Sequence, residues 1–147
     1  YRSPVLVVIS LIPNILPLVM VAGFMGFVGI ELKPATAVIF SISFGVAVDD
    51  TIHLLARLKQ ELRRGLNGST AIRNSLLGTG KAIVITSVIL AGGFLVLMTS
   101  QFQSSVYMGG LIGLTVILAL LGDIFLLPAL LYTWTRYCEK HGINPFP

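Results

Sequence analysis

The residues best suited to chemistry in this sequence are two adjacent carboxylates, Asp49 and Asp50, with His53 shortly after them. They lie in an otherwise apolar run, 34–56, that is long enough to cross a bilayer as a helix. An ionised Asp near the centre of a membrane helix costs roughly 2.5–3.5 kcal/mol, so each needs a cation, a bound ion or a proton to offset that cost. Because adjacent carboxylates repel each other, we expect at least one to bind and release a proton in a usable pH range.

The spacing of the surrounding residues indicates a single helix face. A row at i+4 intervals drifts only slowly around a helix, and its small members allow a neighbouring helix to approach closely. The row contains Ser41, Gly45, Asp49, His53 and Arg57. In a structural interpretation the acids only form hydrogen bonds between helices. In the functional interpretation, which we favour, they bind and release protons or a cation during a transport cycle.

Composition and charge indicate a membrane protein. The 147 residues are 55% hydrophobic and only 11% charged, with a mean hydropathy of +0.92, whereas a soluble domain carries about 25% charged residues. The net charge of +4 does not indicate a nucleic-acid partner, because nine of the ten Lys and Arg residues lie near the chain ends or around one loop. These nine are Arg2, Arg57, Lys59, Arg63, Arg64, Arg73, Lys81, Arg136 and Lys140, and the tenth is Lys33.

Four apolar runs predict four transmembrane helices, at about 4–28, 35–57, 81–99 and 106–134. Between the second and third runs, residues 58–80 alternate apolar and basic side chains, which predicts an amphipathic connector lying on the inner membrane surface. The predicted fold class is therefore an all-α membrane protein whose expected partner is the lipid bilayer.

The distribution of basic residues also predicts the orientation in the membrane. By the positive-inside rule, both termini and the 58–80 connector lie in the cytoplasm. We accordingly assign 1–135 to a transmembrane domain and 136–147 to a cytoplasmic tail. The chain begins at Tyr1 without a signal-peptide pattern, and we expect it to be the C-terminal fragment of a longer, multi-pass protein.

Other polar residues in the apolar runs are weaker candidates for a functional site. Asn14 is expected to form a hydrogen bond between helices. The hydroxyls of Thr86 and Ser87 most often bond to carbonyls of their own helix. Asp123 is a third intramembrane acid, but it lies about one turn from the cytoplasmic end of the apolar core, so we rank it as auxiliary to the pair.

The sequence does not favour an enzyme. It contains no metal-ligand cluster, no phosphate-binding loop and no catalytic triad of the soluble type. An intramembrane aspartyl protease would carry a Gly-x-Gly-Asp motif, but Asp123 is preceded by Leu120-Leu121-Gly122, so the first glycine is missing.

The order of motifs resembles the resistance–nodulation–division (RND) superfamily, in particular its MMPL-type and hopanoid-exporter-like branch. The shared features are a proline-containing helix, the stretch Gly45-Val46-Ala47-Val48-Asp49-Asp50, a basic loop, the stretch Lys81-Ala82-Ile83-Val84-Ile85-Thr86-Ser87, and a long helix with Leu127-Pro128-Ala129-Leu130. The resemblance covers nearly all of 1–135. It implies a six-helix bundle to which these four helices contribute, with the missing N-terminal part of the same protein as a partner and with homo-oligomers as an option.

The resemblance also implies roles for individual residues. Asp49 and Asp50 correspond to the proton-relay helix, with His53 one turn beyond them. Thr86 stands where the family places a hydroxyl near the relay, and Lys81 where a basic residue precedes it. The implied activity is export of lipids or other hydrophobic compounds from a bacterial cytoplasmic membrane, driven by the proton motive force without a cofactor.

Two alternatives from other classes stay open at this stage. Sterol-sensing-like or scaffold modules share this helix pattern without transporting anything, and protein-export auxiliary subunits of the same superfamily move polypeptide. The extracytoplasmic domains that would discriminate between them do not occur in this sequence. No basic residue lies deep in a predicted helix, so we expect a cation partner for the acids from the missing helices, or acids that stay protonated at rest.

Overall fold

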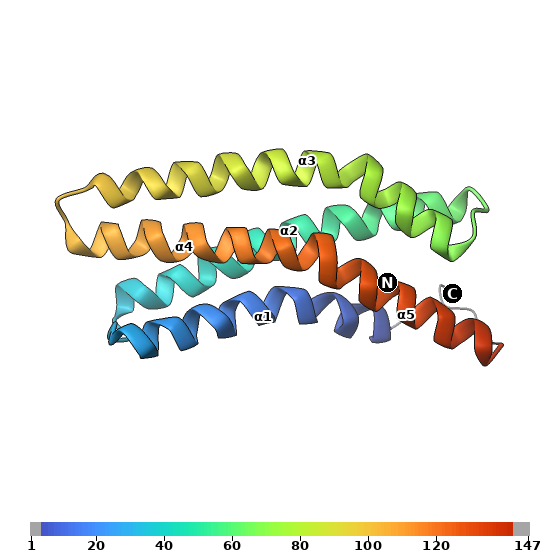
Figure 1. Ribbon diagram of the computed structural model, residues 1–147, viewed down its shortest axis with the longest axis horizontal. Helices are drawn as coiled ribbons and strands as arrows, with labels where there is room; N and C mark the ends of the chain where they lie inside the picture. The colour runs from blue at the N-terminus through green and yellow to red at the C-terminus, as the bar shows by residue number, and fades with distance from the viewer. Residues whose placement is uncertain (1–3, 143–147) are drawn as a thin grey trace.

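Each apolar run forms a long helix in the computed structural model, which describes residues 4–142 (Figure 1). The main helices are α1 (Pro4–Val28), α2 (Pro34–Arg63), α3 (Gly68–Val96), α4 (Gln103–Leu121) and α5 (Leu127–Lys140). A short 3-10 turn, η1 (Leu97–Thr99), ends α3, and a π-helical segment, η2 (Gly122–Leu126), joins α4 to α5. Four segments are long and apolar enough to cross a membrane: Val7–Val28, Thr36–Arg63, Gly68–Thr99 and Gln103–Lys140. The predicted all-α fold with four membrane-spanning helices is thus confirmed.

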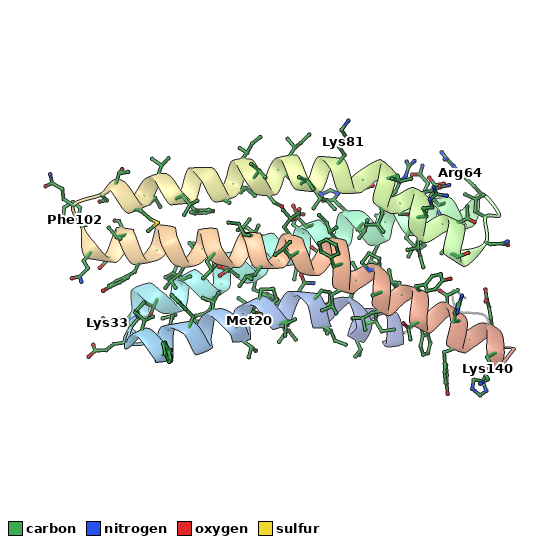
Figure 2. The ribbon with its side chains drawn as sticks, viewed as in Figure 1. Met20, Lys33, Arg64, Lys81, Phe102 and Lys140 are labelled. Atoms are coloured by element: carbon green, nitrogen blue, oxygen red, sulfur yellow. The ribbon has the colours of Figure 1, made fainter. Side chains whose placement is uncertain are left out.

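Two tight turns reverse the chain at opposite ends of the bundle. Gly29 (φ 77°) follows α1 and Gly65 (φ 81°) follows α2, both in the left-handed region that a side chain disfavours. Figure 1 shows the α1–α2 and α3–α4 turns at one end, with the α2–α3 turn and the end of α5 at the other. The helix polarity therefore places Lys33 at one end of the molecule and Arg64 at the opposite end (Figure 2).

The expectation of a separate surface helix over 58–80 is wrong. Instead α2 continues to Arg63, a turn follows at 64–67, and α3 begins at Gly68 rather than near residue 81. Apolar residues of this segment pack between the helices, because Leu58 and Ile72 belong to the same buried cluster. With 30 and 29 residues, α2 and α3 are longer than the roughly 20 residues that a bilayer core requires.

The last predicted helix, 106–134, also has different bounds and is not uniform. It begins at Gln103 and continues through η2 and α5 to Lys140, so the first part of the expected 136–147 tail is helical, and 143–147 lie outside the described residues. The wide π-helical turn immediately precedes Pro128, whose ring would collide with the carbonyl of residue 124 in a regular α-helix.

Two buried apolar clusters hold the helices together, one toward each end of the bundle. The cluster near the 64–67 turn contains Leu54, Leu55, Leu58, Ala71, Ile72, Ile83, Leu127 and Leu131. The cluster toward the other end contains Val21, Met25, Ile39, Ala91, Leu111, Ile112 and Val116. Between the two clusters, α1, α2, α3 and η2 each carry buried polar residues, namely Asn14, Asp50, Thr51, Ser87 and Asp123. These residues form a polar layer inside an otherwise apolar bundle.

Small residues allow α4 to approach α3 closely. A Cβ atom added at Gly109 would collide with the carbonyl oxygen of Phe94 and would lie 2.8 Å from Cβ of Leu97. At Gly113 a Cβ atom would lie 3.2 Å from the side chain of Leu95. This contact fixes the position of α3 in the bundle and with it the face that α3 presents to α2.

Candidate functional site

The centre of the polar layer is a hydrogen bond between α2 and α3. The hydroxyl of Ser87 donates to Oδ2 of Asp50 at 3.0 Å, and both residues are buried, with 1% and 8% of their surface exposed. Ser87 reaches this position because it shares the buried face of α3 with Ile83 and Ala91, one turn to either side. One hydrogen bond from a hydroxyl compensates only a small part of the desolvation cost of an ionised carboxylate in an apolar environment.

Asp49 lies on a different face of α2 from Asp50. Consecutive helical residues are rotated by about 100°, so the two adjacent acids point in different directions. Oδ1 of Asp49 lies 3.5 Å from Nε2 of His53 one turn later, and the two side chains are 71% and 66% exposed on the described part of the chain. The acidic pair is therefore divided into a buried carboxyl that faces α3 and an open carboxyl beside an imidazole.

A groove between α2 and α3 connects these residues. It has a volume of about 540 Å³, and its lining includes all four predicted relay residues: Asp49, Asp50, His53 and Thr86. Thr86 lies in the groove, but its hydroxyl bonds to the carbonyl oxygens of Ala82 and Ile83 in its own helix, at 3.1 and 3.0 Å. The hydroxyl that contacts the acid is that of its neighbour Ser87.

Neither Arg57, two turns after the acids on α2, nor Lys81 of α3 forms an ion pair with the acids. Lys81 is exposed, and Figure 2 shows its side chain pointing away from α4. Arg57 bonds to Glu61 instead, Nη2 to Oε1 at 2.9 Å, and Arg64 lies 3.3 Å from the same oxygen. Glu61 is 4% exposed at its side chain, so these ion pairs tie the end of α2 together near the 64–67 turn.

Asp123 lies in a second polar cluster, on the opposite side of α2 from the groove. The hydroxyl oxygen of Thr51 is 2.8 Å from Oδ1 of Asp123 and 3.0 Å from Oδ1 of Asn14. The amide nitrogen of Asn14 donates to the carbonyl oxygen of Ser10 at 2.9 Å. All three members of the cluster are 2% exposed. Asp123 is thus fully inside the bundle, joined to α1 and α2, rather than at its surface.

Prolines of α1 explain how η2 approaches so closely. Pro17 has no N–H group, so the carbonyl of Pro13 has no partner one turn later in the helix. That carbonyl faces Gly122, where an added Cβ atom would lie only 3.1 Å from its oxygen. The glycine allows this approach and positions the next residue, Asp123, at the Thr51 hydroxyl, which also contacts Asn14 of α1.

Sequence reasoning missed Ser87 and Thr51 as site residues and treated Asn14 only as a helix-to-helix contact. Ser87 had a usable signal, because it lies four residues from both Ile83 and Ala91 on one helix face. Thr51 and Asn14 had no comparable signal, because their contacts join residues 37 and 72 positions apart.

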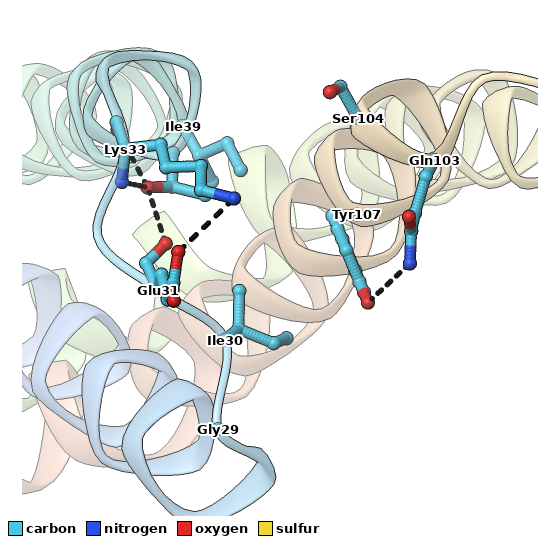
Figure 3. A pocket seen from close by; sticks show the side chains of 9 residues that line it. Gly29, Ile30, Glu31, Lys33, Ile39, Gln103, Ser104 and Tyr107 are labelled. Carbon is cyan, nitrogen blue, oxygen red and sulfur yellow. Dashed lines mark hydrogen bonds and ion pairs between the residues drawn. The ribbon is translucent and has the colours of Figure 1, made fainter.

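A different pocket lies at the other end of the bundle, between the α1–α2 turn and the start of α4. It has a volume of about 280 Å³. An ion pair between Lys33 and Glu31, at 3.2 Å, lies on one side of it. A hydrogen bond from Gln103 to Tyr107, at 3.1 Å, lies on the other side (Figure 3). Within residues 4–142, no three His, Cys, Asp or Glu side chains are grouped so that they could hold a metal ion.

Comparison with known proteins identifies relatives along almost the whole chain. It is 30% identical over 137 residues to MJ1562 of Methanocaldococcus jannaschii, named as a membrane protein; the match covers 93% of this chain and 35% of that protein. It is 31% identical to ActII-3 of Streptomyces coelicolor, also named as a membrane protein, over 99% of this chain and 22% of that protein. It is 25% identical to the trehalose monomycolate exporter MmpL3 of Mycolicibacterium smegmatis, over 78% of this chain and 13% of that exporter.

The chain thus spans about a third or less of the length of these curated relatives. No solved structure matches it at a significant level. The relatives are named as membrane proteins or exporters, which agrees with the four membrane-spanning helices and with the absence of an enzyme motif in the sequence. The family model for the MMPL family matches residues 1–144. The chain is a multi-pass membrane protein, and it belongs to the MMPL family of the RND superfamily.

Proposed function

We propose that this chain forms the proton-coupling part of the transmembrane domain of an exporter of lipids or other hydrophobic compounds. The observation that carries the proposal is the division of the acidic pair: Asp50 is buried against Ser87, whereas Asp49 opens to a groove beside His53. A buried carboxyl between two apolar clusters has a large difference in solvation between its neutral and ionised forms. Its protonation state can therefore bias how α2 packs on α3.

The proposed cycle couples a proton to a helix movement. A proton enters through the groove from the extracytoplasmic side and neutralises Asp49 or Asp50. The neutral carboxyl group then accepts weaker hydrogen bonds than the carboxylate did. α2 then shifts against α3, and release of the proton to the cytoplasm restores the first arrangement. One elementary charge crossing 100 mV releases about 2.3 kcal/mol, enough to change a two-state equilibrium constant by roughly fiftyfold.

The membrane orientation is part of the proposal. The end of the bundle that carries Arg64 and Lys140 also carries the Glu61 ion pairs, and Lys33 lies at the other end (Figure 2). This separation supports a cytoplasmic 64–67 turn by the positive-inside rule. The membrane in question is the cytoplasmic membrane, and a cation that pairs with the acids is contributed by helices outside this chain.

The type of substrate rests on the family. One relative is named as an exporter of trehalose monomycolate, a glycolipid, and it aligns with 78% of this chain. This chain itself consists of helices long and apolar enough to span a membrane, and these carry the coupling residues proposed here. We therefore assign hydrophobic compounds as the class and no single compound.

The test is substitution of the acids in the intact protein. Asp50→Asn and Asp49→Asn should each abolish export from membrane vesicles while the protein still inserts, because removing an ionisable group from an apolar span lowers its insertion cost. Glu139→Gln, an acid near the end of α5, is the matched control and should export at the normal rate. If both Asn variants exported normally, the acids would be structural and a module without transport would be the better description.

A further inference from the structure

The cluster of Asn14, Thr51 and Asp123 is separate from the groove that contains the acidic pair. Asp50 and Thr51 are consecutive residues of α2, yet Asp50 contacts Ser87 of α3 while Thr51 contacts α1 and η2. α2 therefore carries polar contacts on two sides at the same level. The proposed proton coupling makes use of only one of these sides.

The number of hydrogen atoms in the cluster does not match its contacts if Asp123 is ionised. The hydroxyl of Thr51 has one hydrogen atom but three oxygen neighbours within 3.2 Å: Oδ1 of Asp123 at 2.8 Å, Oδ1 of Asn14 at 3.0 Å and the carbonyl of Ala47 at 3.2 Å. The amide nitrogen of Asn14 donates to the carbonyl oxygen of Ser10, and the atom of Asn14 that faces Thr51 is its oxygen, which can only accept. A carboxylate and a carbonyl are acceptors only.

A proton on Asp123 resolves this shortage. With the proton on Oδ1, Asp123 donates to Thr51, and the Thr51 hydroxyl is free to donate to Asn14. The second carboxyl oxygen, Oδ2 of Asp123, is buried without a hydrogen-bond partner among the described residues. In an apolar interior, an oxygen without a hydrogen-bond donor costs far less free energy when the carboxyl group is neutral than when it is ionised.

We propose that Asp123 is a second proton-binding site of this membrane domain, and that its proton determines whether Thr51 donates its hydrogen bond to Asn14 of α1 or to Asp123 of η2. In the protonated state the chain of donors is Asp123 to Thr51 to Asn14. When the proton leaves to water, the Thr51 hydroxyl rotates to donate to the Asp123 carboxylate, and Asn14 loses its donor. Binding of a proton thus ties α1 to α2, and release of that proton frees α1.

Few titratable groups lie near Asp123 on the elements packed around it. α1 contains no titratable side chain over its length, and Pro13 and Asn14 face the cluster from that helix. On α2 the ionisable group that acts on Asp123 is Asp50, next to Thr51. The titratable residues of the helix that contains Asp123 lie toward its two far ends, at Tyr107 and from Tyr132 onward. Protonation of Asp123 would therefore act mainly on the hydrogen bonds of Thr51 and on the ionisation of Asp50.

The backbone around the cluster is suited to movement. α1 lacks helical hydrogen bonds at Pro13 and Pro17, and Asp123 lies in a π-helical segment ahead of Pro128. A cavity of about 310 Å³ lies beside Asn14 and Thr51, the two residues that the Asp123 proton would connect, and its lining is otherwise mainly apolar. This inference deepens the proposed proton coupling and rests on it for its purpose, but the binding of a proton at Asp123 can be measured without any transport.

The test is infrared difference spectroscopy of the intact protein in lipid vesicles, taken between acidic and alkaline pH. Protonated carboxyl groups give a C=O stretching band that ionised ones lack. We expect one such band to be lost in Asp123→Asn and kept in both Asp49→Asn and Asp50→Asn. In Thr51→Val, which keeps the shape but removes the hydroxyl, the band should shift in frequency, and Thr51→Ser should restore it.

The outcomes separate this inference from the proposed function. If every protonated-carboxyl band of the unaltered protein survived in Asp123→Asn, or if no band responded to Thr51→Val, the second proton site would be overturned whatever the transport results are. Loss of export in Asp50→Asn together with an unchanged band supports both proposals. Normal export in Asp49→Asn and Asp50→Asn removes the proposed function, yet the band still decides whether Asp123 binds a proton. If Asp123→Asn does not fold, the Thr51→Val and Thr51→Ser spectra decide.

Discussion

Ser87 of α3 donates its hydroxyl to Asp50 of α2, whereas Thr86, the adjacent residue with the same chemistry, bonds only to carbonyls of its own helix. The two hydroxyls differ by about 100° around α3, and one is buried while the other lines the open groove. Thr86 and Ser87 are thus a natural matched pair: both carry a hydroxyl at almost the same level of α3, and they differ mainly in the direction in which it points.

The first prediction uses this pair. Ser87→Ala should reduce export by roughly tenfold or more, because a hydrogen bond to a charged group contributes about 1.5–3 kcal/mol. Thr86→Ala should have a much smaller effect, since it removes a bond that stays within one helix. Initial export rates in membrane vesicles, normalised to the amount of inserted protein, measure the difference. The opposite ranking would mean that Thr86 and not Ser87 acts on the acid.

The second prediction concerns His53, whose Nε2 lies 3.5 Å from Oδ1 of Asp49. His53→Gln keeps a polar side chain of similar size but cannot titrate. We expect export to lose part of its pH dependence between about pH 5 and 8, the range in which an imidazole changes charge. His141→Gln, beyond the end of α5, is the control and should leave the profile unchanged. An unaltered rate and pH profile in His53→Gln would remove this residue from the relay.

The third prediction concerns orientation. With the buried Cys138 replaced by alanine, a cysteine at position 67 should be labelled by a membrane-impermeant reagent only from the cytoplasmic side. A cysteine at position 101 should be labelled only from the opposite side, because Figure 1 shows the two turns at opposite ends of the bundle. The measurement compares the extent of labelling at each cysteine in intact cells and in permeabilised cells. A reversed pattern would place the acids in the wrong half of the membrane for a proton that enters from outside.

The fourth prediction concerns the α3–α4 contact. Gly109→Ala should lower the stability of the protein by about 1–3 kcal/mol, since its Cβ atom would collide with the Phe94 carbonyl and the helices would have to separate. Gly93→Ala is the control, because no atom lies within 4 Å of the added Cβ atom and alanine favours a helix. Thermal unfolding of the detergent-solubilised protein should show a lower midpoint for the first variant only. Equal midpoints would mean that α4 can shift without cost.

The residues alone were sufficient to identify the membrane class and the four spanning helices. Hydropathy and length act locally, so each apolar run could be recognised without knowledge of its neighbours. The same is true of the acidic pair, since an ionisable residue in an apolar run is unusual whatever surrounds it. The motifs around Asp49 and Asp50 were also specific enough to indicate the family.

The segment around residues 58–80 shows where local reasoning failed. Its mixture of leucines and basic residues is compatible both with a helix on the membrane surface and with two helix ends packed against each other. Only the contact between Leu58 and its cluster partner Ile72 decides between the two, because it depends on where the 64–67 turn brings α3 relative to α2.

The partners of the acids were likewise decided by the tertiary structure. The sequence determined that hydroxyls and a third acid were present, but not that Ser87 would meet Asp50 or that Asp123 would meet Thr51. Those contacts join residues 37 and 72 positions apart. They depend on the rotation of α3 set by Gly109 and on the approach of η2 to Pro13 allowed by Gly122. The rotation of a helix about its own axis depends on its side-chain contacts with all neighbouring helices, so no local sequence pattern predicts it.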